Sequence, residues 1–169
     1  MTRFRTGAVT LATPEDTQAF GRALATLLRA GDLVILTGDL GAGKTTLTQG
    51  IGAGLHVRGP ITSPTFVIAR VHPTLAAGPA LVHVDAYRLG SFAELDDMDL
   101  DADIADSVTL VEWGEGLAED LTDSHLAIRM TADPATETRR VDIIAVGDRW
   151  QTTGSRSALQ ALTSEDDAS

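Results

Sequence analysis

Apolar residues along the chain recur with two spacings, one typical of helices and one of buried strands. Between residues 14 and 30 they recur every three or four positions, and Thr13 followed by Pro14 is typical of a helix start, so we predict a helix there that covers a sheet face. The run over residues 33–37 is short and almost wholly apolar, as expected for a strand buried on both faces. Over residues 44–55, apolar side chains at every fourth position predict a second helix.

Five later runs of apolar and β-branched residues predict further strands. They cover residues 66–71, 80–85, 108–112, 125–130 and 141–146. Strands alternate with helices at first and then follow one another, so we expect an α/β fold whose sheet is mostly parallel, with antiparallel additions in the C-terminal part. We assign residues 1–154 to a single domain and residues 155–169 to a polar tail with the composition of a disordered segment.

The composition of the chain disfavours several classes of function. The chain carries 24 acidic and 13 basic residues, a net charge of −11, which repels polyphosphate, so we expect no direct nucleic-acid binding. No apolar run approaches the roughly 18 residues that a membrane helix needs, so we expect no membrane association and a cytoplasmic location. Cysteine is absent and the 4 histidines lack the HExxH spacing, which argues against thiolate and zinc chemistry.

A phosphate-binding motif lies between the first predicted strand and the second predicted helix. Residues 38–45 are G-D-L-G-A-G-K-T, which satisfies the pattern G-x-x-x-x-G-K-[ST]. Its glycines let successive backbone N–H groups face phosphate oxygens, and the helix that follows adds partial positive charge. In this interpretation Lys44 reaches the β- and γ-phosphates, Thr45 ligates Mg²⁺ and Thr46 contacts the α-phosphate. We therefore expect the three-layer sandwich of a P-loop NTPase.

The expected ligands are ATP or ADP together with Mg²⁺. A GTPase would need an N/T-K-x-D signature, and the chain has no asparagine and no lysine besides Lys44. The loop residues that we expect to hold the nucleotide are Asp39, Leu40, Gly41, Ala42, Gly43, Lys44, Thr45 and Thr46.

Two carboxylates follow apolar runs, at the positions where strands end. Either Asp85 or Glu112 could hold the metal, directly or through water, and the other could orient the attacking water as a general base; each could also be a solvated residue at the sheet edge. Thr65 stands where nucleotide hydrolases often sense the γ-phosphate, although a plain turn explains its position equally well. Trp113 could shield the metal site or stack on a partner, and the alternative is that it fills the core.

Two other classes of protein share these features. A P-loop small-molecule kinase has the same strand, loop and helix, but its lid usually supplies several arginines, whereas the segment 94–106 here is acidic. A scaffold that binds nucleotide without hydrolysing it would tolerate the loss of Lys44 or Asp85.

Four motifs in the same order resemble those of the bacterial TsaE (YjeE) family, over roughly residues 10–146. They are G-D-L-G-A-G-K-T-T (38–46), S-P-T-F (63–66), H-V-D-A-Y-R (83–88) and V-E-W (111–113). The resemblance implies a small ATPase, weak alone, that is required with TsaB and TsaD for N6-threonylcarbamoyladenosine at position 37 of tRNAs reading ANN codons. It also implies that TsaD carries out the transfer to tRNA.

The resemblance also implies roles for individual residues. It implies that Lys44 and Thr45 bind phosphate and Mg²⁺, and that Glu112 joins the metal site. It implies that Asp85 is the essential acidic residue, so the implied catalytic set is Lys44, Asp85 and Glu112, and that Thr65 is the switch threonine. Two further residues, Arg139 and Arg140, stand near a family arginine position and are candidates for base contact.

Overall fold

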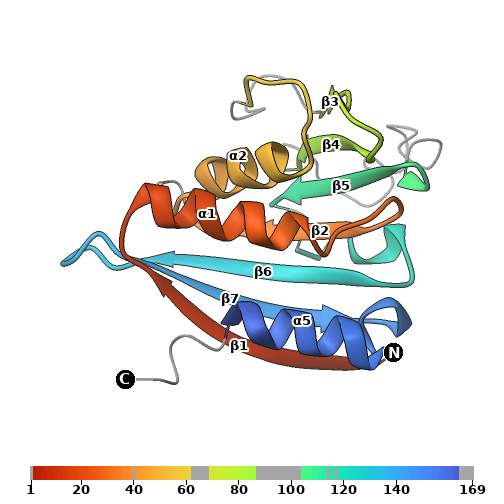
Figure 1. Ribbon diagram of the computed structural model, residues 1–169. Helices are drawn as coiled ribbons and strands as arrows, with labels where there is room; N and C mark the ends of the chain where they lie inside the picture. The colour runs from red at the N-terminus through yellow and green to blue at the C-terminus, as the bar shows by residue number, and fades with distance from the viewer. Residues whose placement is uncertain are drawn as a thin grey trace.

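A computed structural model describes most of the chain as a mixed sheet with helices packed on it (Figure 1). The residues it describes are 2–39, 41–61, 69–86, 104–113, 115–116 and 118–163. Within these residues the helices are α1 (Pro14–Ala25), α2 (Lys44–Gly54) and α5 (Thr153–Thr163), with short 3₁₀ turns η1 (Glu119–Leu121) and η2 (Asp148–Trp150). The strands are β1 (Arg3–Leu11), β2 (Leu33–Thr37), β3 (Ala69–His72), β4 (Ala80–Asp85), β5 (Ser107–Glu112), β6 (His125–Ala132) and β7 (Arg139–Val146).

The described strands form one seven-stranded sheet in the order β1-β7-β6-β2-β5-β4-β3. Its centre is parallel, because β2 pairs in parallel with β5 and β6, and β4 pairs in parallel with β5. The expected antiparallel addition in the C-terminal part is β7, which pairs with β6. The sequence did not predict β1, which pairs with β7, nor the antiparallel pairing of β3 with β4. The predicted α/β class is confirmed.

Helix α1 begins where the sequence predicts and ends earlier. The Thr13 side chain accepts a hydrogen bond from the backbone N–H of Asp16 at 3.1 Å, which caps the first turn. The helix stops at Ala25, short of the predicted residue 30. Beyond Ala25 the N–H groups of Leu27 and Leu28 donate to carbonyls only three residues back, those of Leu24 and Ala25, so the α-helical hydrogen-bond pattern ends there.

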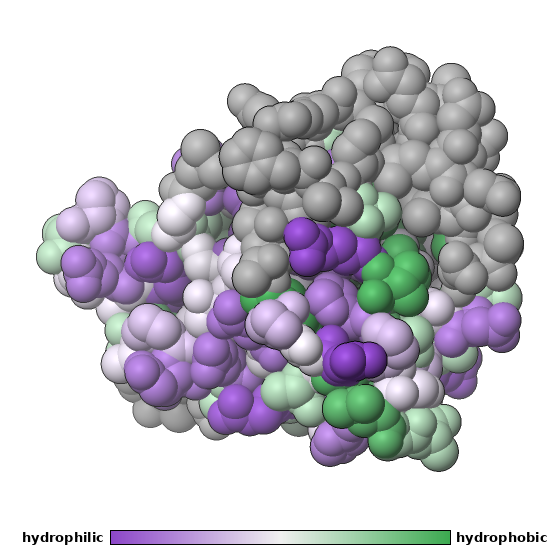
Figure 2. Space-filling model, turned by 90° about the horizontal axis from the view of Figure 1, so that it is seen from above, coloured by the Kyte–Doolittle hydropathy of each residue, from purple (hydrophilic) through white to green (hydrophobic). Residues whose placement is uncertain are grey.

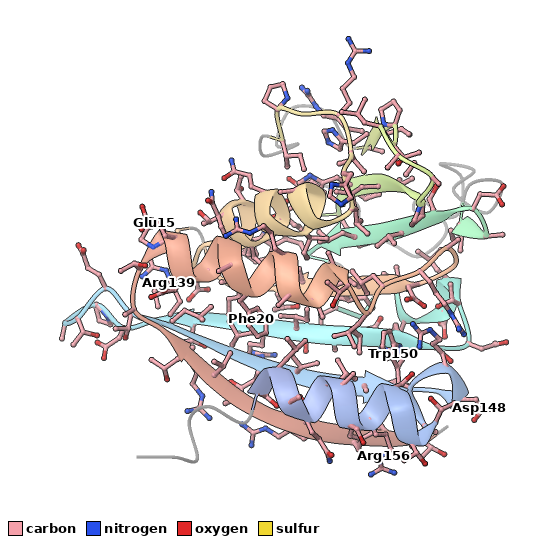
Figure 3. All side chains as sticks on the ribbon, viewed as in Figure 1. Glu15, Phe20, Arg139, Asp148, Trp150 and Arg156 are labelled. Carbon is pink, nitrogen blue, oxygen red and sulfur yellow. The ribbon has the colours of Figure 1, made fainter. Side chains whose placement is uncertain are left out.

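The core lies on both faces of the sheet. The helix-covered face buries a large cluster to which each of the three described helices contributes; among its members are Leu24, Leu36, Leu47, Ile51, Ile128, Ile143, Trp150 and Leu159. Figure 3 shows Phe20 and Trp150 in the layer between helices and sheet. The other face buries a smaller cluster of strand residues with Ile104 and Ala118. Because Leu33 to Leu36 are at most 2% exposed, β2 is buried on both faces, as predicted.

Helix α5 occupies part of the segment that we expected to be an irregular tail. It packs against β1, buries Leu159 completely, and the Thr163 hydroxyl donates to the Thr6 carbonyl at 3.0 Å. The expectation of a disordered tail is therefore wrong for residues 155–163, and residues 164–169 lie outside the described part of the chain.

The surface seen from above is mostly hydrophilic where its residues are described (Figure 2). Hydrophobic residues on that side form small separate groups. Among the described residues, Val71 and Leu75 are the large apolar side chains that stay exposed. No described helix has both the length and the apolar character needed to cross a membrane.

Candidate nucleotide-binding site

The phosphate-binding motif forms the turn between β2 and α2. Gly41 and Gly43 adopt φ values of +81° and +99°, which residues other than glycine rarely adopt. Gly43 is the N-cap of α2, so no side chain caps that helix, and no acidic residue occupies its first turn. The N–H groups at the start of α2 are therefore available to an anion.

Lys44 is buried inside this loop and is only 7% exposed. Its Nζ donates to the Gly38 carbonyl and, at 3.2 Å, to the Asp39 carbonyl. Burial lowers the pKa of Lys44, while the nearby carboxylates of Glu112, Asp39 and Asp85 act in the opposite direction. The ammonium group thus lies among negative groups at the loop, where a phosphate that enters can pair with it.

The two predicted carboxylates lie side by side at the ends of adjacent strands. Asp85 of β4 is in register with Glu112 of β5, and Glu112 is also in register with Leu36 of β2, just before the loop. Asp85 is 7% exposed and Glu112 is 4% exposed. The Ala86 N–H donates to the Glu112 carbonyl at 2.8 Å, which fixes the two strand ends together. The alternative that these are solvated residues at the sheet edge is wrong for both.

Trp113 contacts the loop lysine. Its indole ring lies 4.3 Å from Lys44 Nζ, measured to the ring centroid, which is the geometry of a cation–π contact. The Trp113 backbone adopts φ +60° and its N–H donates to the Leu36 carbonyl at 3.2 Å. Trp113 is half-buried against the site. Trp113 belongs to neither of the two core clusters formed by the described residues, and its ring lies against the loop lysine.

The other predicted ligand residues fall into two groups. Asp39 and Gly41 are exposed, Ala42 is buried, and Thr45 and Thr46 are half-buried in the first turn of α2, so all five lie at the loop. Two further predicted residues, Leu40 and Thr65, lie outside the described residues.

The two arginines that the sequence suggested make different contacts in the structure. Arg139, at the start of β7, donates through Nη2 to the Gly41 carbonyl at 3.2 Å and so touches the loop. Arg140 instead pairs with Asp142 on the same strand at 3.1 Å. Figure 3 shows Arg139 at the end of the sheet opposite Asp148. Of the two arginines, only Arg139 is shown in contact with the phosphate loop.

Sequence reasoning missed one residue of the site. His83 Nε2 lies 2.7 Å from Glu112 Oε2, and both side chains are buried. A signal was available, because residues two apart on a strand face the same side, which places His83 beside Asp85 on β4. What the sequence lacked was the pairing of β4 with β5 that brings Glu112 to the same place.

The residues present suit a magnesium–nucleotide pair. Mg²⁺ in nucleotide sites is commonly held by one or two protein oxygens together with substrate phosphates. Thr45 supplies a hydroxyl and Glu112 a carboxylate at the loop, and the uncapped start of α2 suits phosphate. Within the described residues there is no group of three or more histidine, aspartate or glutamate side chains that could hold a metal by themselves.

Comparisons with known proteins agree on one family. A sequence model described as threonylcarbamoyl adenosine biosynthesis protein TsaE matches residues 11–141. A protein of Streptomyces coelicolor with the name tRNA threonylcarbamoyladenosine biosynthesis protein TsaE is 61% identical over 136 residues, which are 78% of this chain and 92% of that protein. The protein of the same name from Mycobacterium tuberculosis is 51% identical over 140 residues, 79% of this chain and 83% of the relative.

Similarity extends to a more distant relative and to a solved structure. The protein of that name from Bacillus subtilis is 35% identical over 139 residues, 82% of this chain and 85% of the relative. The crystal structure of Bacillus subtilis YdiB superimposes with a TM-score of 0.70 at 28% identity, covering 98% of this chain and 97% of the other.

Proposed function

The chain belongs to the TsaE family, and on that basis we propose that it binds and hydrolyses ATP as an accessory protein of tRNA threonylcarbamoyladenosine biosynthesis. In this proposal it acts in the cytoplasm with TsaB and TsaD, in the formation of N6-threonylcarbamoyladenosine at position 37 of tRNAs reading ANN codons. TsaD carries out the transfer, and contact with tRNA is left to the partners, which agrees with the net charge of −11 on this chain.

One observation carries the ATPase part of the proposal: the loop lysine and two buried carboxylates converge at one edge of the sheet. Lys44 lies in the loop, and Asp85 and Glu112 end the adjacent strands in register. Burial lowers the pKa of Lys44, and the charges of Glu112 and Asp85 act against that lowering. This is the set of groups that phosphoryl transfer to water requires, a cation for the phosphates and carboxylates for the metal and the attacking water.

Each residue then has a distinct task. The N–H groups of the loop and of the start of α2 hold the phosphates, and Lys44 turns from the loop carbonyls to them. Thr45 and Glu112 would hold Mg²⁺, which when bound neutralises charge on the phosphates. Asp85 orients the water that attacks and accepts its proton. Trp113 covers the lysine and keeps bulk water from it.

Calorimetric titration of a non-hydrolysable ATP analogue, with and without Mg²⁺, tests this assignment. Mg²⁺ is expected to tighten binding to the parent protein. Glu112→Ala is expected to reduce that gain by about tenfold or more, since the loss of even an outer partner of a metal lowers affinity about 10–100-fold. Asp148→Ala serves as the matched control, because it removes an exposed carboxylate at the end of the molecule away from Arg139 (Figure 3). An equal Mg²⁺ dependence in Glu112→Ala and the parent would refute the metal role.

Turnover separates the ATPase from a small-molecule kinase. We expect slow ATP hydrolysis by the chain alone and a changed rate when TsaB and TsaD are added. Turnover that appears only with a small-molecule acceptor would instead favour the kinase.

A further inference from the structure

His83 lies in the interior of the sheet, next to the site but outside every role assigned so far. Its side chain has no exposed surface, and it stands on β4 two residues before Asp85. The neighbouring strand β5 brings Glu112 against it. Val82 and Val84 face the opposite side of the sheet, in the smaller core cluster, whereas Leu81, on the same side as His83, belongs to the larger cluster.

The imidazole ring has its polar contact with Glu112. Its Nε2 lies 2.7 Å from Glu112 Oε2, while its Nδ1 is buried and has no hydrogen-bond partner in the described part of the chain. A carboxylate is an acceptor, so Nε2 carries the hydrogen and donates it to Glu112. This tautomer leaves Nδ1 with a lone pair, which avoids a buried N–H donor without an acceptor.

We propose that His83 is a positioning residue that fixes the Glu112 carboxylate in the orientation required for Mg²⁺. The inference rests on the proposed function, in which Glu112 belongs to the metal site. The hydrogen bond to Oε2 limits rotation of the carboxylate and so fixes the direction in which its oxygens face an ion. Residues that hydrogen-bond to metal-ligating carboxylates and histidines commonly orient them, and the loss of such a residue lowers metal affinity about 10–100-fold.

The hydrogen bond to Glu112, rather than burial alone, separates His83 from a histidine with a purely structural role. A polar ring at a position with no exposed surface costs free energy when one of its nitrogens lacks a partner. An apolar residue of similar size would fill the same space without that cost. The hydrogen bond to Glu112 is the feature that such a residue could not supply.

The test compares nucleotide affinity with and without Mg²⁺ in four proteins. They are the parent protein, His83→Leu, His83→Gln and His125→Leu. His83→Leu removes the donor, and His83→Gln keeps an N–H donor on a side chain of similar reach. His125→Leu is the matched control, because His125 is also a buried strand histidine whose Nδ1 finds no partner among the described residues, but it lies on β6 away from Glu112.

We expect His83→Leu to lower the gain in affinity from Mg²⁺ about tenfold while affinity without Mg²⁺ stays within about twofold of the parent. His83→Gln is expected to recover most of the gain, and His125→Leu to retain all of it. A folded His83→Leu variant with the full gain would overturn the inference and leave the proposed function standing. A parent protein without any gain from Mg²⁺ would overturn both.

A second measurement does not depend on the folding of His83→Leu. In ¹⁵N spectra of the imidazole rings of the parent protein bound to ADP, the Nε2–H signal of His83, assigned with His83→Gln, is expected to shift when Mg²⁺ is added. The same addition to Glu112→Gln is expected to leave that signal in place. An unmoved His83 signal in the parent, at Mg²⁺ concentrations that tighten ADP binding, contradicts the proposed contact between the two residues and the ion.

Discussion

The close packing of α1 on α2 predicts that Gly50→Ala destabilises the protein. A Cβ on Gly50 would lie 2.3 Å from the carbonyl oxygen of Gln18, and contacts under 3.0 Å do not occur at real Cβ atoms. The obstacle is backbone, so α2 must move away from α1 by at least about 0.7 Å. Overpacking of this kind costs about 1–3 kcal/mol, and a backbone clash belongs at the upper end. Alanine recovers about 1 kcal/mol through helix propensity, which leaves a net loss of about 2 kcal/mol.

Urea unfolding followed by circular dichroism measures this loss, with Gly154→Ala as the control. Gly154 lies in the first turn of α5, and a Cβ there would meet no atom within 4 Å. We expect Gly154→Ala to leave the free energy of unfolding unchanged or to raise it by up to about 1 kcal/mol. In a chain of this size, a loss of about 2 kcal/mol lowers Tm by about 4–8 °C. A Gly50→Ala protein as stable as Gly154→Ala would refute the argument from close packing.

Three further predictions follow from single contacts. Arg149→Met leaves the buried Asp32 carboxylate without the arginine that contacts it at 3.0 Å, and we expect urea unfolding to show a loss of about 3 kcal/mol; a loss under about 1 kcal/mol would contradict this. Burial lowers the pKa of His125, so as pH falls below about 6.5 the unfolded state takes up a proton before the folded state does. The free energy of unfolding should therefore decline from that pH down to the pKa of the folded state. The decline should be smaller in His125→Leu, and an equal decline in that variant would contradict this assignment. Arg139→Ala should weaken ATP binding about tenfold in calorimetric titration, because Arg139 donates to the backbone of the phosphate loop. Arg140→Ala should leave ATP binding unchanged, since Arg140 pairs with Asp142 instead. Equal effects of the two substitutions would contradict the role of Arg139.

The sequence predicted the part of the fold that is encoded locally. The strand, the glycine-rich turn and the helix that begins at Lys44 follow one another without a gap, and each has its own signal in spacing or residue type. Both carboxylates were predicted for the same reason, because each ends an apolar run.

Strand β1 was missed because a bulge changes its inward face. The register with β7 shifts between Arg5 and Gly7, and Gly7 adopts φ +128°. Before the bulge Phe4 faces the helix-covered core, and after it Val9 and Leu11 do. The apolar positions therefore change from even to odd numbers, and the alternation that predicts a strand is broken.

Contacts between distant segments explain the other omissions. Helix α5 has a narrow apolar stripe, Leu159 and Leu162, whose partners lie on β1 and in α1 at the opposite end of the chain. Similarly, His83 meets Glu112, and Arg139 meets the phosphate loop, only because of strand order and register. Residue spacing does not encode that order, so these parts of the site required the structure.

Nucleoside analysis of tRNA tests the central claim most directly. The cells would carry Lys44→Ala as their only copy of this protein, with its level matched to the parent by immunoblot. The account predicts that threonylcarbamoyladenosine falls steeply and returns when the parent protein is supplied, because the lysine of the phosphate loop is then missing. An undiminished amount of threonylcarbamoyladenosine in those cells would contradict the account.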